Sequence, residues 1–220
     1  MSPEDFISVA EDTGQIIHLG KWVLEQSCRQ MKQWQNQYPR YRDLTLSVNL
    51  SGKQFLQPNL VEQISEVLES TGFNPRNLQL EITESVVIEN TEIVTEMLMR
   101  LHELGIQLTM DDFGTGYSSL SYLHNFPIDV LKIDKSFISR KGGDSKNQIV
   151  STIITLARNM GLKVVAEGVE TEEQLAHLKD LQCAYGQGFL FSYPNTAAAT
   201  EKLICQITEA PVRDQVETAA

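Results

Sequence analysis

The chain has 220 residues, of which 41% are hydrophobic and 21% are charged, and its formal net charge is −11. This composition is typical of a globular domain with enough chain to bury a core, and not of a disordered segment. The negative charge disfavours a protein that binds DNA or an anionic membrane surface, because phosphate groups attract basic patches.

Six apolar segments alternate with helical stretches along the chain. The first helix is predicted to begin at Pro3, with Ser2 as its N-cap. Further helices are predicted near 18–36, 60–70, 90–104, 147–160, 172–181 and 196–210. The predicted strands are 44–51, 78–85, 106–114, 130–137, 162–170 and 185–192. Because strands and helices alternate, we expect βαβ crossovers and a mainly parallel sheet. Residues 1–209 are predicted to form one domain, followed by a disordered tail over 210–220.

Each predicted strand carries polar or acidic residues near its C-terminal end. These residues are Asn49, Glu81 with Glu84, Asp111 with Asp112, Lys132 with Asp134, Glu167 with Glu170, and Gln187. Such groups are costly in a buried parallel strand unless they are satisfied. In a (β/α)8 barrel all the C-terminal strand ends meet at one face, where active sites lie. We therefore predict an α/β fold of the TIM-barrel type; a doubly wound open sheet, the alternative, would bring fewer of these ends together.

The strand-end residues offer only oxygen ligands. Those considered for metal binding are Asn49, Glu81, Asp111, Asp112 and Glu167. Hard divalent cations such as Mg²⁺ and Mn²⁺ prefer such ligands, and two neighbouring ions suit displacement at phosphorus. Lys132 could stabilise charge on a phosphate or orient the attacking water, and Glu167 could act as a general base. Taken singly, each acid is better explained as a solvated or hydrogen-bonded turn residue; their shared position favours the metal site.

Other chemistries find little support in the motifs. The triplet Asp112-Phe113-Gly114 also occurs in protein kinases, but the chain has neither a GxGxxG loop nor an HRD loop. The four histidines show no metal-ligand spacing, and the three cysteines include no CxxC pair. No apolar run approaches the roughly 20 residues that cross a bilayer. These features favour a cytoplasmic protein with reduced thiols and no membrane segment.

Several short segments resemble the motif series of EAL domains, the cyclic di-GMP phosphodiesterases of bacterial signalling. The matching segments are SPEDFISVAEDTGQIIHLGKWVL, SVNLS, EITES, DDFGTGYSSLSYL, LKIDKSFI, VVAEGVET and GQGFLFS. They follow the family's order and cover roughly residues 2–195. The resemblance implies a TIM-like (β/α)8 barrel of the EAL type that hydrolyses cyclic di-GMP to linear pGpG with Mg²⁺ or Mn²⁺.

The resemblance also implies roles for individual residues. The metal ligands it implies are Asn49, Glu81, Asp111 and Asp112. It implies that Lys132 and Glu167 serve the water-activation step, with Asp134, Glu170 and Gln187 nearby. Glu84 would help to hold the loop DFGTGYSS, which contains Gly114 and Gly116. The loop region 112–123 would couple the site to a homodimer.

One part of the family pattern does not occur in the chain. The Glu-Ala-Leu strand that names the family precedes its SPEDF segment, and its glutamate ligates metal. No Glu-Ala-Leu tripeptide occurs in the 220 residues. We therefore expect a barrel that lacks its first strands and hydrolysis that is weak or absent.

Three explanations for this difference stay open. The chain could be a fragment or mis-started reading frame of an active phosphodiesterase. It could instead be a degenerate relative, a non-catalytic module that binds cyclic di-GMP or a protein partner. An oligomer could also supply the missing strands by exchange, because an open barrel exposes edges that pair with another chain.

Overall fold

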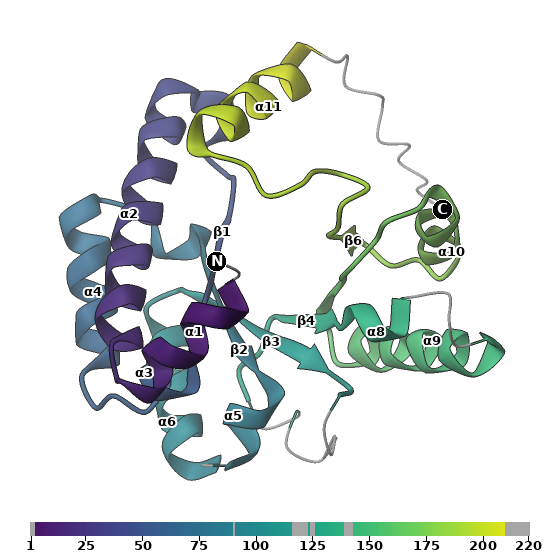
Figure 1. Cartoon of the computed structure of the whole chain (residues 1–220), viewed down its shortest axis with the longest axis horizontal. Helices are drawn as coiled ribbons and strands as arrows, with labels where there is room; N and C mark the ends of the chain where they lie inside the picture. Colours follow the sequence, from purple (N-terminus) through teal and green to yellow (C-terminus); the bar gives the residue numbers. More distant parts are fainter. Residues whose placement is uncertain (1–2, 90, 116–122, 124–125, 139–142, 210–220) are drawn as a thin grey trace.

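The computed structural model describes residues 3–89, 91–115, 123, 126–138 and 143–209 (Figure 1). The elements of the first half are α1 Pro3–Asp12, α2 Ile16–Gln37, η1 Pro39–Tyr41, β1 Leu46–Asn49, α3 Gly52–Phe55, α4 Leu60–Thr71, η2 Pro75–Asn77, β2 Leu78–Thr83, α5 Glu84–Glu89 and α6 Thr91–Glu103. The second half contains β3 Gln107–Phe113, β4 Val130–Ile133, α8 Lys135–Ile138, α9 Gly143–Asn159, β5 Lys163–Ala166, α10 Glu172–Asp180, β6 Tyr185–Gly186 and α11 Ala197–Glu209.

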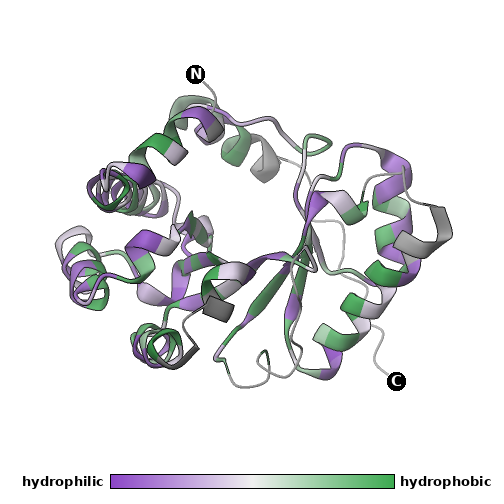
Figure 2. Ribbon diagram, turned by 60° about the horizontal axis from the view of Figure 1, so that its bottom comes forward, coloured by the Kyte–Doolittle hydropathy of each residue, from purple (hydrophilic) through white to green (hydrophobic). Residues whose placement is uncertain are grey.

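The six strands form one parallel sheet in the order β1-β2-β3-β4-β5-β6. Each strand therefore pairs with the strand that follows it in the sequence. Helices α4 and α6 cover the sheet on one side of the molecule, and α9 and α10 cover it on the other (Figure 1). Figure 2 shows hydrophobic strands at the centre of the molecule and helices of mixed hydropathy around them. This arrangement confirms the predicted parallel sheet and its helical layer.

One face of the sheet is apolar and packs against the helices. Alternate residues of a strand point to opposite faces, and Leu78, Leu80 and Ile82 of β2 are at most 1% exposed. Leu108 of β3 and Leu131 of β4 continue this core at 0% exposure. Burying each such side chain stabilises the fold by about 1.5–3 kcal/mol. The residues between these leucines are mostly polar, so the opposite face of the sheet carries the polar side chains.

The curved sheet is open in the part of the chain that the structure describes. Strands β1 and β6 are its two edges and do not pair with each other. Helix α11 returns from the β6 side to α2 and η1 across this opening (Figure 1). There the hydroxyl of Tyr38 donates a hydrogen bond to Glu201, and the hydroxyl of Tyr41 donates to the carbonyl oxygen of Ile204, both at 2.9 Å. Helix α11 thus links the last described residues to the first helices.

The strands are shorter than the sequence predicts. The predicted strand 130–137 is divided, because β4 ends at Ile133 and α8 begins at Lys135. The carboxylate of Asp134 accepts a hydrogen bond from the N–H of Ser136 at 2.9 Å, and this contact stabilises the start of a helix. The predicted strand 185–192 contains only the two-residue β6. The predicted tail, 210–220, lies outside the described residues.

Candidate active site

Lys132 lies at the centre of the polar face of the sheet. Its ammonium nitrogen Nζ lies 2.7 Å from Oε2 of Glu81, 3.1 Å from Oδ2 of Asp111 and 2.6 Å from Oε1 of Glu167. Lys132 is 4% exposed, Glu81 6% and Asp111 9%. A buried charge is tolerated only when it is paired, so one lysine and three acids from β2, β3 and the end of β5 stabilise one another. The structure thus brings together four residues that the sequence predicts as site residues.

The pKa values in this cluster follow from burial and pairing. Burial alone lowers the pKa of Lys132, but its hydrogen bonds to Glu167 and Glu81 outweigh that effect and raise it. Burial raises the pKa of Glu167, although the charge of Lys132 opposes the change. Lys132 is therefore a permanent cation near neutral pH, and Glu167 is a stronger proton acceptor than an ordinary glutamate.

Asp111 and Asp112 lie on the same side of the sheet because the backbone is irregular between them. Adjacent residues of a regular strand point to opposite faces. The pairing of β3 with β4 shifts between Met110 and Phe113, and Asp112 has a φ of 56°, in the left-handed region. Aspartate tolerates this conformation better than most residues. The N–H of Asp112 also donates to Oδ1 of Asp111 at 2.9 Å, so this short bulge directs two neighbouring carboxylates into one site.

Three carboxylates can meet at one point of this face. Asp111, Asp112 and Glu167 each place an oxygen within 4.8 Å of the others. All three donors are oxygens, which suits a hard divalent cation such as Mg²⁺ or Mn²⁺. Asn49 is exposed and is the Cα partner of Glu81 across β1 and β2, so both lie at the same end of the sheet. The donor chemistry fits a divalent metal ion.

Glu84 fixes the backbone that follows the two aspartates. Its side chain is 5% exposed, and its Oε2 accepts a hydrogen bond from the N–H of Gly114 at 3.1 Å. Gly114 has a φ of +93°, and a Cβ there would lie 3.1 Å from the ring of Phe137. Only glycine suits this position, because the backbone is left-handed and a ring packs against it. Gly116 and residues 117–122 of the predicted dimerisation loop lie outside the described residues.

The other predicted residues lie around the site without joining the Lys132 cluster. The hydrogen bonds that Asp134 accepts at the start of α8 lower its pKa, although its burial acts in the opposite direction. The side chains of Glu170 and Gln187 are exposed. The N–H of Glu170 donates to Oε1 of Gln174 at 2.7 Å, and the N–H of Gln187 donates to the carbonyl of Ala166 at 2.8 Å. The hydrogen bonds described for these two residues therefore involve their backbone groups and not their side chains.

Two residues of the site are absent from the predicted set. Gly168 follows Glu167 and has a φ of +68°, and a Cβ there would lie 2.5 Å from Cβ and 3.2 Å from Cα of Lys135. The signal that could have revealed this contact is the glycine directly after a strand-end acid. The sequence did not indicate Lys135 as a site residue because 130–137 is predicted as a strand, whereas α8 begins at this lysine in the structure.

Gly168→Ala is expected to lower the free energy of unfolding by about 2–4 kcal/mol, because a left-handed backbone and a steric clash with Lys135 both oppose the new methyl group. Gly161→Ala is the matched control, since Gly161 also has a positive φ, +75°, but no atom lies within 4 Å of the position that its new methyl group would take. Urea denaturation of both variants separates the clash from the backbone effect. Equal losses of stability in the two variants would contradict the close contact.

Acidification is expected to weaken divalent-ion binding before ordinary carboxyl groups protonate. Burial, and then the charges of Asp111 and Asp134, raise the pKa of Asp112, and burial raises that of Glu167. A group with a raised pKa keeps its proton where an ordinary acid is ionised, so a metal ion must displace that proton. Calorimetric titration with Mn²⁺ from neutral to mildly acidic pH measures the effect. An affinity that stays constant over this range would contradict it.

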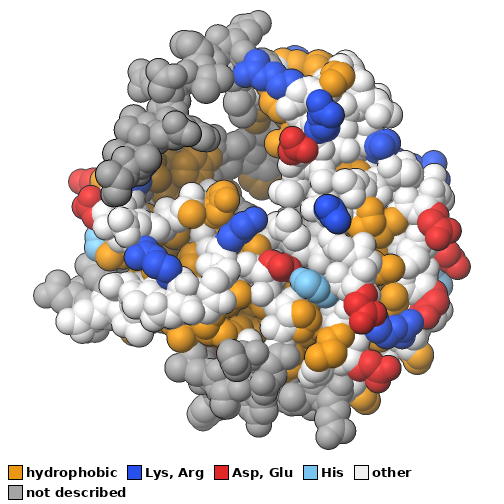
Figure 3. Space-filling view, turned by 180° about the vertical axis from the view of Figure 1, so that it is seen from behind, with side chains coloured by type: hydrophobic (Ala, Val, Ile, Leu, Met, Phe, Trp, Pro, Cys, Tyr) orange, Lys and Arg blue, Asp and Glu red, His pale blue; other side chains and the backbone are white. Residues whose placement is uncertain are grey.

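No helix in the described part of the chain is long and apolar enough to cross a bilayer. Seen from behind, the described surface carries lysine and arginine side chains as well as aspartate and glutamate side chains, without one sign dominating (Figure 3). The acids described above are instead concentrated at the C-terminal strand ends.

Comparison with known sequences gives one consistent family. The model of the EAL domain family matches residues 1–194. Signaling protein YkoW of Bacillus subtilis is 41% identical over 205 residues, which are 93% of this chain and 25% of that protein. The bifunctional diguanylate cyclase/cyclic di-GMP phosphodiesterase MucR of Pseudomonas aeruginosa is 41% identical over 208 residues, 94% of this chain and 30% of that protein. The chain thus spans between a quarter and a third of these relatives.

Solved structures agree with the sequence comparison. A MucR phosphodiesterase in complex with c-di-GMP has a TM-score of 0.87 and 41% identity, and the match covers 91% of this chain and 81% of that chain. A manganese and cyclic di-GMP complex of BlrP1 from Klebsiella pneumoniae has a TM-score of 0.74 and 30% identity, over 88% of this chain and 48% of that one. These likenesses confirm the predicted TIM-like fold.

Proposed function

The chain belongs to the EAL domain family, and from this premise we propose that it binds cyclic di-GMP and hydrolyses one of its two phosphodiester bonds to give linear pGpG. The observation that carries the proposal is the meeting of Asp111, Asp112 and Glu167, whose carboxylate oxygens lie within 4.8 Å of one another beside a buried lysine. An all-oxygen cluster at the C-terminal strand ends of a barrel-type sheet suits metal-assisted phosphoryl chemistry.

Each residue of the site has a role in this proposal. The proposed metal ligands are Asn49, Glu81, Asp111, Asp112 and Glu167. When bound, Mg²⁺ or Mn²⁺ would polarise the phosphate and lower the pKa of the attacking water. Glu167 accepts the proton of that water, which its raised pKa favours. Lys132 holds Glu167 in place through their 2.6 Å ion pair and offsets negative charge at the phosphate.

The reaction balances as a simple hydrolysis. The oxygen of water forms a bond to phosphorus, and the bond between that phosphorus and the 3′ oxygen breaks. One proton of water goes to Glu167, which later releases it to solvent, and the leaving 3′ oxygen takes up a proton from solvent to become a hydroxyl group. The product, linear pGpG, keeps the phosphate on its 5′ oxygen.

Low turnover is part of this proposal. The glutamate of the Glu-Ala-Leu motif is not among the 220 residues, and Glu81 and Asp111 already contact Lys132. The same contacts favour a second candidate function, a module that binds cyclic di-GMP without hydrolysing it, because an internal cation partly neutralises the acids. The two functions differ in product formation and not in binding.

The test measures pGpG formation from cyclic di-GMP in Mn²⁺ and separately in Mg²⁺. The variant is Asp112→Asn, which keeps a residue that tolerates a left-handed backbone and removes the carboxylate. Its matched control is Asp180→Asn, at the exposed end of α10. Product from the native chain and the control, with a loss of at least about 100-fold in Asp112→Asn, would support the enzyme.

Two other outcomes would change the conclusion. Binding of cyclic di-GMP without product would establish the non-catalytic module. Equal product from the native chain and Asp112→Asn would contradict the proposed metal site. The comparison of the two ions also decides which of Mg²⁺ and Mn²⁺ supports turnover.

We also propose a homodimer, which the open sheet supports. Strand β1 has no partner on its outer side in the described chain, and an exposed edge pairs readily with another strand. The partner would be a second copy, through exchanged strands or through the 112–123 loop region. Size-exclusion chromatography with light scattering tests this, and a monomer at all concentrations would exclude it.

A further inference from the structure

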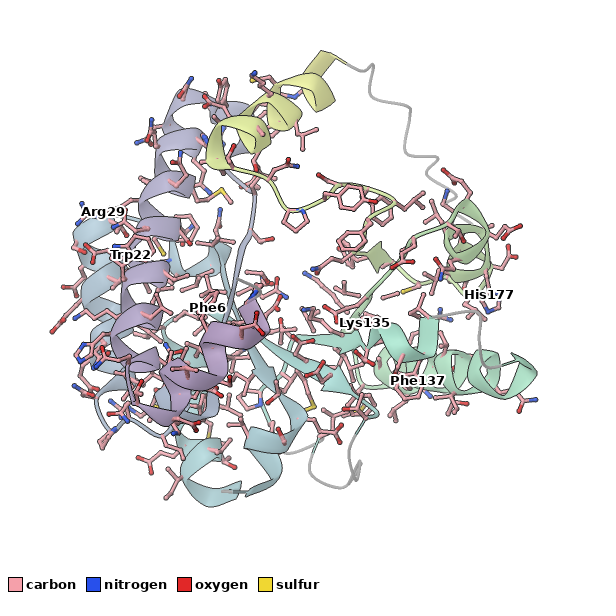
Figure 4. The ribbon with its side chains drawn as sticks, viewed as in Figure 1. Phe6, Trp22, Arg29, Lys135, Phe137 and His177 are labelled. Atoms are coloured by element: carbon pink, nitrogen blue, oxygen red, sulfur yellow. The ribbon has the colours of Figure 1, made fainter. Side chains whose placement is uncertain are left out.

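Lys135 places an exposed positive charge at the rim of the acidic site. It is the first residue of α8, two positions after the end of β4, and its side chain is exposed. Figure 4 shows Lys135 at the start of α8, close to the C-terminal strand ends. No hydrogen bond or ion pair joins its ammonium group to another residue in the part of the chain that the structure describes.

Lys135 lies close to residues of the candidate site. Its Cβ lies so near Gly168 that an added methyl group there would come within 2.5 Å, and Gly168 directly follows Glu167. Its charge also acts on two carboxyl groups of the site. Burial and neighbouring carboxylates raise the pKa of Asp112, and the charge of Lys135 opposes that rise; at Asp134 the same charge contributes to a lowered pKa. Lys135 therefore stands between the end of β5 and the aspartates of β3, and its free ammonium is available to a bound anion.

Other lysines at this end of the sheet are already engaged. Lys132 is 4% exposed and contacts three carboxylates. Lys53, which follows β1 in α3, donates a hydrogen bond to the carbonyl of Glu11. Lys135 differs from both because it is exposed and its described contacts leave the ammonium open.

The substrate presents a second charge that the catalytic cluster does not accommodate. Cyclic di-GMP carries two phosphodiester groups, and the proposed reaction occupies the metal cluster with one of them. The other phosphate would face a rim of carboxylates, which repel it unless a cation intervenes. A lysine on a flexible stem is a common ligand for such a phosphate.

We propose, on the basis of the function proposed above, that the ammonium group of Lys135 binds the non-reacting phosphate of cyclic di-GMP. Lys135 is thus a positioning residue that recognises the second phosphodiester group of the substrate. It has no part in proton transfer or in holding the metal. Its contribution belongs to substrate binding, because the second phosphate undergoes no change of charge during the reaction.

The test compares two substrates in saturating Mn²⁺. Cyclic di-GMP has two phosphates, and bis(p-nitrophenyl) phosphate has one. In Lys135→Gln the KM for cyclic di-GMP is expected to rise about 10-fold, and kcat should stay within about 2-fold of the native value. The reason is that the variant loses one charge-assisted contact made equally in the ground state and the transition state. The kcat/KM for bis(p-nitrophenyl) phosphate should stay unchanged. Lys135→Arg keeps the charge and should restore the KM.

A matched control separates this contact from a general effect of charge. Lys179→Gln removes the same charge from an exposed position on α10 and should leave the KM for both substrates unchanged. Three results would overturn the proposal. They are equal losses on both substrates, a KM for cyclic di-GMP that does not change, and a higher Mn²⁺ requirement in Lys135→Gln. Loss of a cation beside Asp112 should leave the Mn²⁺ requirement equal or lower.

The failure of the proposed hydrolysis is distinguishable from the failure of this inference. If the native chain hydrolyses neither substrate, calorimetric binding of cyclic di-GMP in Ca²⁺ replaces the kinetic readout. An affinity about 10-fold weaker in Lys135→Gln, and native-like in Lys179→Gln, would then support the contact in a binding module. Equal affinities, or no binding by the native chain, would overturn it.

Discussion

Replacing Glu167 by glutamine is expected to lower kcat for cyclic di-GMP hydrolysis by about 10²–10⁴-fold, the range typical of a lost general base. Glutamine keeps the size and one oxygen of the side chain but cannot accept the proton of water. Because burial raises the pKa of Glu167, native kcat should also increase with pH as this carboxyl group loses its proton. That part of the pH profile should disappear in the variant. Rates of pGpG formation measure both effects.

The control for this variant is Glu69→Gln, an exposed glutamate on α4. It removes one negative charge at a distance from the site and should leave kcat unchanged. Binding of cyclic di-GMP in saturating Ca²⁺ should remain within a few-fold of the native value in both variants, so that the loss lies in chemistry. A Glu167→Gln variant that retains native kcat would exclude Glu167 as the proton acceptor.

Lys132→Met is expected to lower the free energy of unfolding of the metal-free protein by about 3–5 kcal/mol, because removal of one partner leaves buried charges uncompensated. The three carboxylates that remain are Glu81, Asp111 and Glu167, all within 3.1 Å of the lysine nitrogen in the native structure. Since pairing raises the pKa of Lys132, its contribution is fully present below the pKa of an unfolded lysine. It is lost only as the pH rises through the higher folded value.

A divalent ion should partly rescue this variant. Mn²⁺ can supply the charge that Lys132 supplied, so the variant should gain more stability from the ion than the native protein does. Urea denaturation with and without Mn²⁺ measures the difference. Lys163→Met, an exposed lysine of β5, is the control and should change stability by less than about 0.5 kcal/mol. A Lys132→Met variant as stable as this control would contradict the buried cluster.

The parallel sheet and the face that carries the candidate site could be predicted from the sequence. Apolar segments alternating with helices predict a parallel sheet, and the polar residue near each strand end marks one face. Lys132, Glu81, Asp111 and Glu167 meet there because parallel strands place their C-terminal ends at the same edge. This part of the site depends on the parallel direction of the strands, which the alternation of strands and helices predicts.

The remaining details depend on local backbone geometry that periodicity does not reveal. Regular alternation would send Asp111 and Asp112 to opposite faces, and only the φ of 56° at Asp112 with the shifted pairing of β3 brings them together. The end of β4 was misplaced for a similar reason. The predicted strand included residues 134–137, but the side chain of Asp134 stabilises a helix that begins at Lys135. Such capping contacts compete with strand propensity.

The contact of α11 with α2 constrains the order in which this protein can complete its fold during synthesis. The hydroxyl of Tyr38 and the carboxylate of Glu201 are separated by 163 positions in the chain. On the ribosome, α2 emerges long before its partner helix, and all six strands must follow before α11 appears. Such a distant contact is slow to form. Until it forms, Tyr38 and Tyr41 lack the hydrogen-bond partners that α11 supplies.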